Sequence, residues 1–130
     1  MLSELPFLLN VNVSHNKIEK LFDFLPPYNL KEASFSFNLI NEIGNLSNFH
    51  YLQTLELNNN KIDKIEGLEY CQRLKTLNLA HNSIKKIEGL DNLPLVNLDL
   101  VIFKKIQFFC YLRQSFCLII FFCVIAVKSD

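Results

Sequence analysis

The chain has 130 residues, of which 50% are hydrophobic and 20% are charged, so it can bury a core and lacks the composition of a disordered protein. Thirteen Lys and Arg balance thirteen Asp and Glu, which excludes the strongly basic surface typical of nucleic-acid-binding proteins. The balance hides an asymmetry, because residues 1–100 hold nine basic and twelve acidic side chains whereas residues 101–130 hold four and one.

The N-terminal segment and the cysteines indicate an intracellular protein. The opening "MLSELPFLLNVNVSHN" has no basic region and only a short apolar run, so we expect no secretory signal. Cys71 stands alone, and the other three cysteines lie in the last thirty residues without the paired spacings of zinc or redox sites. We expect reduced thiols, with Cys71 buried and chemically inert in the segment "EYCQRL".

Between Leu8 and Leu90 the chain repeats an apolar skeleton with a 22-residue period. The skeleton reads LxxLxLxxNxIxxIxxL and occurs four times, for example in "LQTLELNNNKIDKIEGL" and "LKTLNLAHNSIKKIEGL". Its LxLxx part alternates with period two, so one side of a short strand faces inward. One such strand cannot bury its apolar side alone, whereas stacked units share a parallel sheet and a continuous core. In chain order the strands are expected near residues 10–14, 32–36, 54–58 and 76–80.

Each unit carries one Asn after its strand, where the chain must turn. The turn leaves buried backbone N–H and C=O groups without strand partners, and an amide side chain can donate and accept hydrogen bonds at once. We predict that these side chains form a structural ladder that joins each turn to the next. Opposite the strands, so short a unit leaves room for turns or brief 3₁₀ segments but not for long helices. The ladder residues are Asn16, Asn38, Asn60 and Asn82.

The skeleton resembles leucine-rich repeats of the short 22-residue class, whose units read NxIxxIEGL as do Asn60–Leu68 and Asn82–Leu90. The regulatory subunit of protein phosphatase 1 and several axonemal proteins typify this class. Pro6–Ile43 is similar to the repeat region of proteins that join leucine-rich repeats to a guanylate kinase domain, notably in "PPYNLK" at Pro26–Lys31. The resemblance implies an α/β leucine-rich-repeat solenoid, with short parallel strands on the concave face and turns or 3₁₀ segments on the convex face. No kinase chemistry follows, because the chain has no GxxxxGK[ST] phosphate loop.

The repeats end in a partial fifth unit. Leu95 and Leu98 begin it one position early, and Phe103 stands where the next Asn is due. We therefore divide the chain into residues 1–100, which hold four 22-residue units and the partial fifth, and residues 101–130, a hydrophobic tail out of repeat register.

The tail has three competing interpretations. Residues 108–127 have about the length needed to cross a bilayer, although Arg113 interrupts them. A second interpretation is a cap over the open end of the solenoid. The third is sequence unrelated to the fold, in a truncated product of a longer repeat protein, and the abrupt loss of register favours it.

Side chains that point outward from the strands are candidates for binding a protein partner. Stacked strands curve, so these positions should form a concave surface on which short polar groups leave room for a partner's side chains. One column of outward positions is expected to hold Ser14, Ser36, Asn58 and Ala80. Phe37 is the unusual member of the surface, either as an exposed aromatic anchor or as a cover for the layer of Phe35. The predicted partner-binding residues are Asn12, His15, Ser34, Phe37, Glu56, Asn58, Asn78 and His81.

Nothing in the sequence indicates catalysis, a cofactor or a metal site. His15 and His81 are three strands apart, or about 14 Å, which is too far for one ion to bridge. No nucleophile has a base at a suitable spacing, and the alternating charges of "KIDKIE" and "IKKIE" are typical of a solvated edge.

We therefore expect a module without catalytic activity that binds a protein partner of unknown identity on its concave face, with no nucleic-acid partner. One alternative is a tail-anchored membrane protein that presents the repeats to the cytosol. Another is the targeting arm of a guanylate-kinase-domain protein that lacks its kinase half. The expected location is the cytoplasm, and the resemblance implies a ciliary or cytoskeletal setting.

Overall fold

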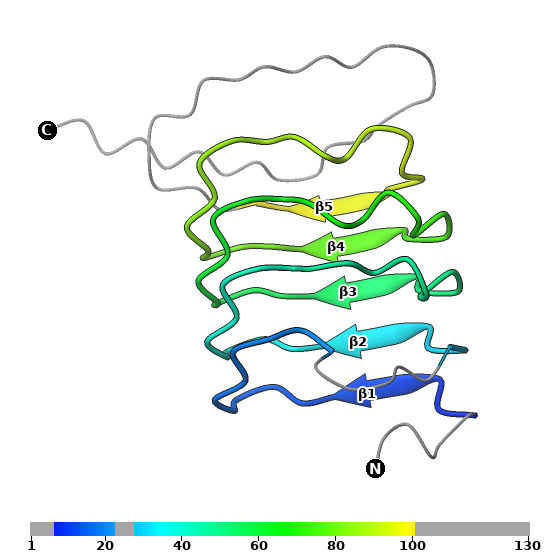
Figure 1. Cartoon of the computed structure of the whole chain (residues 1–130), viewed down its shortest axis with the longest axis horizontal. Coiled ribbons are helices and arrows are strands. Elements are labelled where there is room, and N and C mark those ends of the chain that lie inside the picture. The colour runs from blue at the N-terminus through cyan, green and yellow to red at the C-terminus, as the bar shows by residue number, and fades with distance from the viewer. Residues whose placement is uncertain (1–6, 23–27, 101–130) are drawn as a thin grey trace, which may run out of the picture.

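The computed structural model describes residues 7–22 and 28–100. Within them five short strands form one parallel sheet in the order β1-β2-β3-β4-β5, so every strand pairs with its neighbour in the sequence. The strands stack with the same direction, and the chain returns behind them after each one (Figure 1). This is the predicted solenoid. The strands are β1 (Asn10–Asn12), β2 (Glu32–Ser34), β3 (Thr54–Glu56), β4 (Thr76–Asn78) and β5 (Asn97–Asp99).

The register of the sheet follows the 22-residue period until its last strand. Glu32 pairs with Thr54, and Thr54 pairs with Thr76, so each of these steps advances the chain by one full unit. Thr76 pairs with Asn97, one position short of a full unit. The fifth unit therefore begins early, as the spacing of its leucines predicts, and still continues the sheet.

The core lies directly behind the strands and consists of the repeated aliphatic positions. Leu55 and Leu77 occupy the middle of β3 and β4 and are fully buried. Burying such a side chain contributes about 1.5–3 kcal/mol, so each unit is held mainly by its neighbours. Val11 and Val13 are only partly buried, because within the described residues another repeat lies on one side of them only. The unit centred on β3 buries Leu52, Leu55, Leu57, Ile62, Ile65 and Leu68 to within 1% of full burial.

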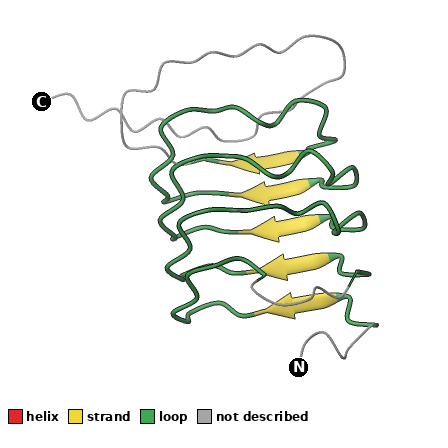
Figure 2. Ribbon diagram, viewed as in Figure 1, coloured by secondary structure: helices red, strands yellow, loops and turns green. Residues whose placement is uncertain are grey.

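The side opposite the strands is built from turns and irregular backbone (Figure 2). The described residues contain no helix of any kind there, so turns are used in place of 3₁₀ segments. Charged side chains cover this side as expected, and the three ion pairs of the described part, Lys64–Glu66, Lys85–Asp63 and Lys86–Glu88, are exposed. Exposed pairs of this kind contribute little to stability.

Gly67 lies where the turns of two neighbouring units approach each other closely. Its φ angle is +75°, and a Cβ atom at this position would lie 1.7 Å from the carbonyl oxygen of Gly44. The N–H of Leu46 also donates to the carbonyl oxygen of Gly67 at 3.1 Å. A side chain is therefore excluded both by the backbone conformation and by the neighbouring backbone.

The side chain of Asn60 joins two neighbouring units. Its Oδ1 accepts a hydrogen bond from the backbone N–H of Ile40 at 3.0 Å, and its Nδ2 donates to the carbonyl oxygen of Phe35 at 3.0 Å. Both of these partners belong to the preceding unit. The same Nδ2 lies 3.0 Å from the carbonyl oxygen of Leu57 in its own unit. One buried carboxamide thus satisfies backbone groups on both sides of the contact.

The same bridge recurs at the neighbouring Asn residues. Asn38 accepts from the N–H of Ile18 at 3.1 Å, and Asn82 accepts from the N–H of Ile62 at 3.0 Å. Among the described residues, Asn16 donates to carbonyl oxygens of its own unit, those of Val13 and Ser14. The four carboxamides occupy equivalent places in successive turns and form a ladder.

The hydrophobic tail lies outside the described residues, so the three interpretations of residues 101–130 stay predictions. Within residues 7–22 and 28–100, no helix has the length and apolar character needed to cross a bilayer.

We predict that Asn60→Ala lowers the free energy of unfolding by about 1–3 kcal/mol, because it leaves the buried N–H of Ile40 without its partner and removes one of the two amide donors, Asn60 and Asn38, to the C=O of Phe35. Asn16→Ala is the matched control, since Asn16 is exposed and its described hydrogen bonds stay within its own unit, and it should cost less than about 1 kcal/mol. Urea denaturation followed by circular dichroism measures both. Equal losses for the two variants would contradict the bridging role.

Candidate partner-binding face

We use the term strand face for the outward side chains of the five strands together with the residues that directly follow them on the same side. None of the eight predicted partner-binding residues is buried. Asn12, His15, Phe37 and His81 are exposed, and the other four are partly exposed. The strand face comprises Asn10, Asn12, Ser14, His15, Glu32, Ser34, Phe37, Thr54, Glu56, Asn58, Asn59, Thr76, Asn78, His81, Asn97 and Asp99.

One column of the strand face has left-handed backbone at every position. This turn column consists of His15, Phe37, Asn59 and His81, with φ angles of 58°, 55°, 57° and 56°. Each of them directly precedes a ladder Asn, so the conformation belongs to the turn that the ladder stabilises. Asn and His tolerate this region comparatively well, whereas a bulky residue rarely adopts it.

Phe37 is the one large apolar member of the turn column. Its side chain is 47% exposed, although a left-handed conformation costs an ordinary residue about 1–2 kcal/mol. Its ring stacks on the imidazole of His15, with 4.4 Å between the ring centroids and 10° between the planes. Phe35, two positions earlier, is 1% exposed and belongs to the core. Phe37 therefore forms a small aromatic surface and is not a core residue.

A chain of hydroxyl groups fixes the position of the Glu56 carboxylate. Ser34 Oγ donates to Glu56 Oε2 at 3.0 Å, and it also lies 2.9 Å from Ser14 Oγ and 3.3 Å from Ser36 Oγ. These contacts run across β1, β2 and β3 at the surface. They hold Glu56 with its carboxylate turned toward β2 and partly exposed.

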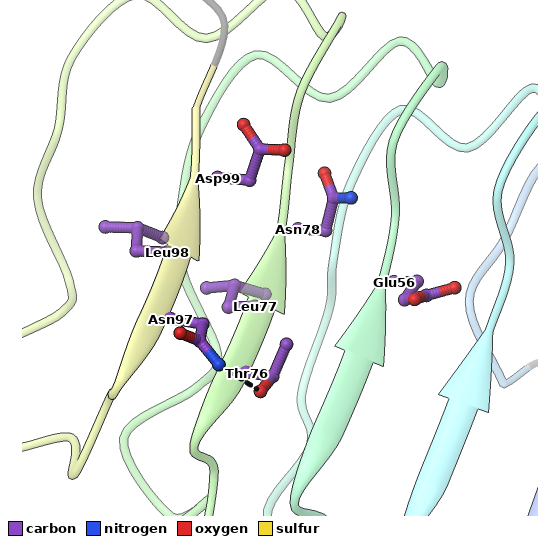
Figure 3. Close-up of a pocket in the computed structure, with 7 residues that line it drawn as sticks. All are labelled: Glu56, Thr76, Leu77, Asn78, Asn97, Leu98 and Asp99. Atoms are coloured by element: carbon purple, nitrogen blue, oxygen red, sulfur yellow. Dashed lines mark hydrogen bonds between the residues drawn. The ribbon is translucent and has the colours of Figure 1, made fainter. Parts of the chain in front are cut away.

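A shallow hollow lies beside Glu56, over β3, β4 and β5 (Figure 3). Its other polar walls come from Asn78 and Asp99, and Thr76 accepts a hydrogen bond of 3.4 Å from the side chain of Asn97. Leu77 and Leu98, which follow Thr76 and Asn97 in β4 and β5, also line the hollow. The hollow thus offers amide, hydroxyl and carboxylate groups next to one another.

Two residues expected on the strand face are buried. Ser36 is 6% exposed and Ala80 is 5% exposed. Both side chains are short and lie where the strand has begun to turn, so neighbouring units cover them; Ser36 Oγ, for example, donates to Asn58 Oδ1 at 2.6 Å. Asn58 remains partly exposed, and its carboxamide is held in place by this bond.

The 22-residue repeat does not by itself predict the hollow. Thr76 and Asn97 line it but are absent from the predicted binding residues. The one available signal is the early start of the fifth unit, which places Asn97 opposite Thr76. The left-handed turn column is likewise unpredicted, although the three His and Asn residues in it are of the types that tolerate this conformation.

Comparisons with known proteins agree with this geometry. Residues 28–70 match the family model for leucine-rich repeats (2 copies). Among solved structures, an internalin from Listeria monocytogenes is similar with a TM-score of 0.57 and 22% sequence identity, over 76% of this chain and 36% of the internalin. The fold is a leucine-rich-repeat solenoid. The chain spans about a third of the internalin's length, and a comparison with curated proteins gives no match.

Leucine-rich-repeat solenoids generally bind proteins and carry no catalytic centre of their own. In the described part of this solenoid, no group of three or more His, Cys, Asp or Glu side chains could hold a metal ion. Cys71 is buried as predicted, and burial, together with the nearby charge of Glu69, raises the pKa of its thiol to about 11. Such a thiol stays protonated at neutral pH and is a poor nucleophile.

We predict that Phe37→Asn changes the free energy of unfolding by less than about 1 kcal/mol. The variant loses the stack with His15, which is worth about 0.5–1.5 kcal/mol, and gains a residue suited to the left-handed conformation, as at Asn59. Phe35→Ala is the contrast, because it opens a cavity in the core and should cost about 3–5 kcal/mol. Thermal unfolding of both variants checks this, and a loss for Phe37→Asn as large as that for Phe35→Ala would show that Phe37 is a core residue.

Proposed function

We propose that this leucine-rich-repeat solenoid is a non-catalytic module that binds a protein partner through its strand face. The observation that carries the proposal is Phe37, which is exposed, stacked on His15 and held in a left-handed conformation. The left-handed turn recurs at each position of the turn column, and at Phe37 it holds a large aromatic ring at the surface. Exposed aromatic residues are also frequent anchors of protein interfaces.

The polar part of the strand face suits the same role. Its side chains are short amides, hydroxyls and carboxylates, and several are already held by hydrogen bonds, as Glu56 is by Ser34 and Asn58 is by Ser36. Groups fixed before binding lose little conformational freedom when a partner arrives. An aromatic anchor beside fixed polar groups is a typical arrangement at a protein interface.

The proposal also includes the resemblance to one class of leucine-rich repeats. A relation to the short 22-residue class and to the repeats of guanylate-kinase-domain proteins is supported by the NxIxxIEGL units and by "PPYNLK". It suggests a cytoplasmic module in a ciliary or cytoskeletal setting, which serves as the targeting arm of a longer protein. An anchor through residues 108–127 is supported by their apolar composition.

We predict that an immobilised wild-type chain recovers a partner from cell extract that Phe37→Asn recovers at least about tenfold less well, because an aromatic anchor is worth about 2 kcal/mol or more. Lys85→Ala serves as the control, since Lys85 is exposed on the opposite side in a pair with Asp63. Quantitative mass spectrometry of the recovered proteins gives the measurement.

The control variant should recover the partner as well as the wild type does. If Phe37→Asn recovers every protein equally well and Lys85→Ala does not, the binding surface lies on the turns and the strand face is excluded.

A further inference from the structure

The charges of the strand face all have one sign. Its ionised side chains are Glu32, Glu56 and Asp99, and none of its positions holds Lys or Arg. Lys31 and Lys75 stand at its rim, one position before β2 and β4. No ion pair within residues 7–22 and 28–100 joins these lysines to the three carboxylates. The strand face is therefore acidic although the whole chain has no net charge.

Two of the carboxylates border the hollow and are held differently. Glu56 is oriented by Ser34 toward β2, whereas Asp99 lies on β5 beside Asn78. They are separated by two strand spacings, or about 10 Å. One cation cannot neutralise both, so two separate basic side chains are needed.

The ring of Phe37 lies close enough to Glu56 for one bound peptide segment to contact both. Phe37 stands three positions after Ser34, the last residue of β2, and Ser34 pairs with Glu56, so the ring lies beyond the end of β2, at most about 10 Å further along the strand direction. A guanidinium group both pairs with carboxylates and stacks on aromatic rings. Arginine therefore suits both the carboxylates and the aromatic ring of the strand face better than lysine does.

The distance from β2 to β5 sets the length of a peptide segment that would cross these strands. From β2 to β5 there are three strand spacings, or about 14 Å, which roughly five extended residues cover. In an extended segment, every second side chain points the same way. Basic residues at alternate positions lie about 7 Å apart along such a segment, and their long side chains can spread to reach Glu56 and Asp99, about 10 Å apart, together.

We propose that the occupant of the strand face is an extended, arginine-bearing segment of a protein partner. It crosses the strands from β2 to β5 and places guanidinium groups at Glu56 and Asp99, with a third side chain against Phe37. This inference rests on the proposed function, since it names the chemistry of the partner that the face binds. Opposite charges at such a surface chiefly set specificity and the rate of encounter.

The test uses a fluorescein-labelled peptide of four alternating Arg–Ser pairs, whose binding to the full chain is followed by fluorescence anisotropy. Glu56→Gln/Asp99→Asn should weaken binding at least about fivefold, because each exposed ion pair contributes a modest amount. Glu42→Gln/Glu69→Gln removes the same net charge from exposed residues off the strand face and should change the affinity less than about twofold. A peptide with uncharged citrulline in place of arginine should bind the wild-type chain at least about fivefold less tightly than the arginine peptide does.

Three results would overturn the proposal: a dissociation constant above about 1 mM for the arginine peptide, equal weakening by the two double variants, or equal binding of the citrulline peptide. Recovery of a partner from cell extract distinguishes failure of this proposal from failure of the proposed function. If a partner depends on Phe37 but is recovered fully by Glu56→Gln/Asp99→Asn, the strand face binds a protein and only the basic occupant is wrong.

Discussion

The carboxamide bridge between neighbouring turns is the interaction on which the rest of this structure depends. Each strand is only three residues long, and backbone hydrogen bonds between units continue past it into the turn, as from the N–H of Asn59 to the carbonyl oxygen of Ala80. The turn that follows would leave further N–H and C=O groups buried without partners, at a cost of about 1–3 kcal/mol each. Asn38, Asn60 and Asn82 remove that cost because one amide can donate to two carbonyl groups and accept from a backbone N–H.

The ladder also determines the shape of the candidate binding surface. The residue before each ladder Asn adopts a left-handed conformation, which turns its side chain out at the end of the strand. Where that residue is Asn59 the conformation is tolerated easily. Where it is Phe37, the turn holds a large ring at the surface against His15. The same backbone geometry is thus structural in one unit and gives a binding feature in another.

Much of the fold can be predicted from the sequence, because regularly spaced residues produce it. The constant spacing of Leu, Ile and Asn predicts the strands, their parallel order and the ladder positions, since short strands bury equivalent residues by stacking them, and the shorter spacing to Leu95 and Leu98 predicts the early fifth unit. Burial of Ser36 and Ala80 does not follow, because it depends on how neighbouring units cover short side chains. The hollow depends on the shortened step to β5, and the strain at Phe37 depends on a φ angle, neither of which a pattern of residue types specifies.

Amide hydrogen exchange at Ile40 and Ile62 tests the central claim most directly. These two N–H groups lie outside the strands, and each donates to the side chain of an Asn in the next unit. If the carboxamides bridge the units in solution, both amides should exchange about as slowly as the N–H of Leu57, which donates to the backbone of Asn78. Exchange at the rate of an exposed turn, while Leu57 remains protected, would show that the ladder does not hold the repeats together.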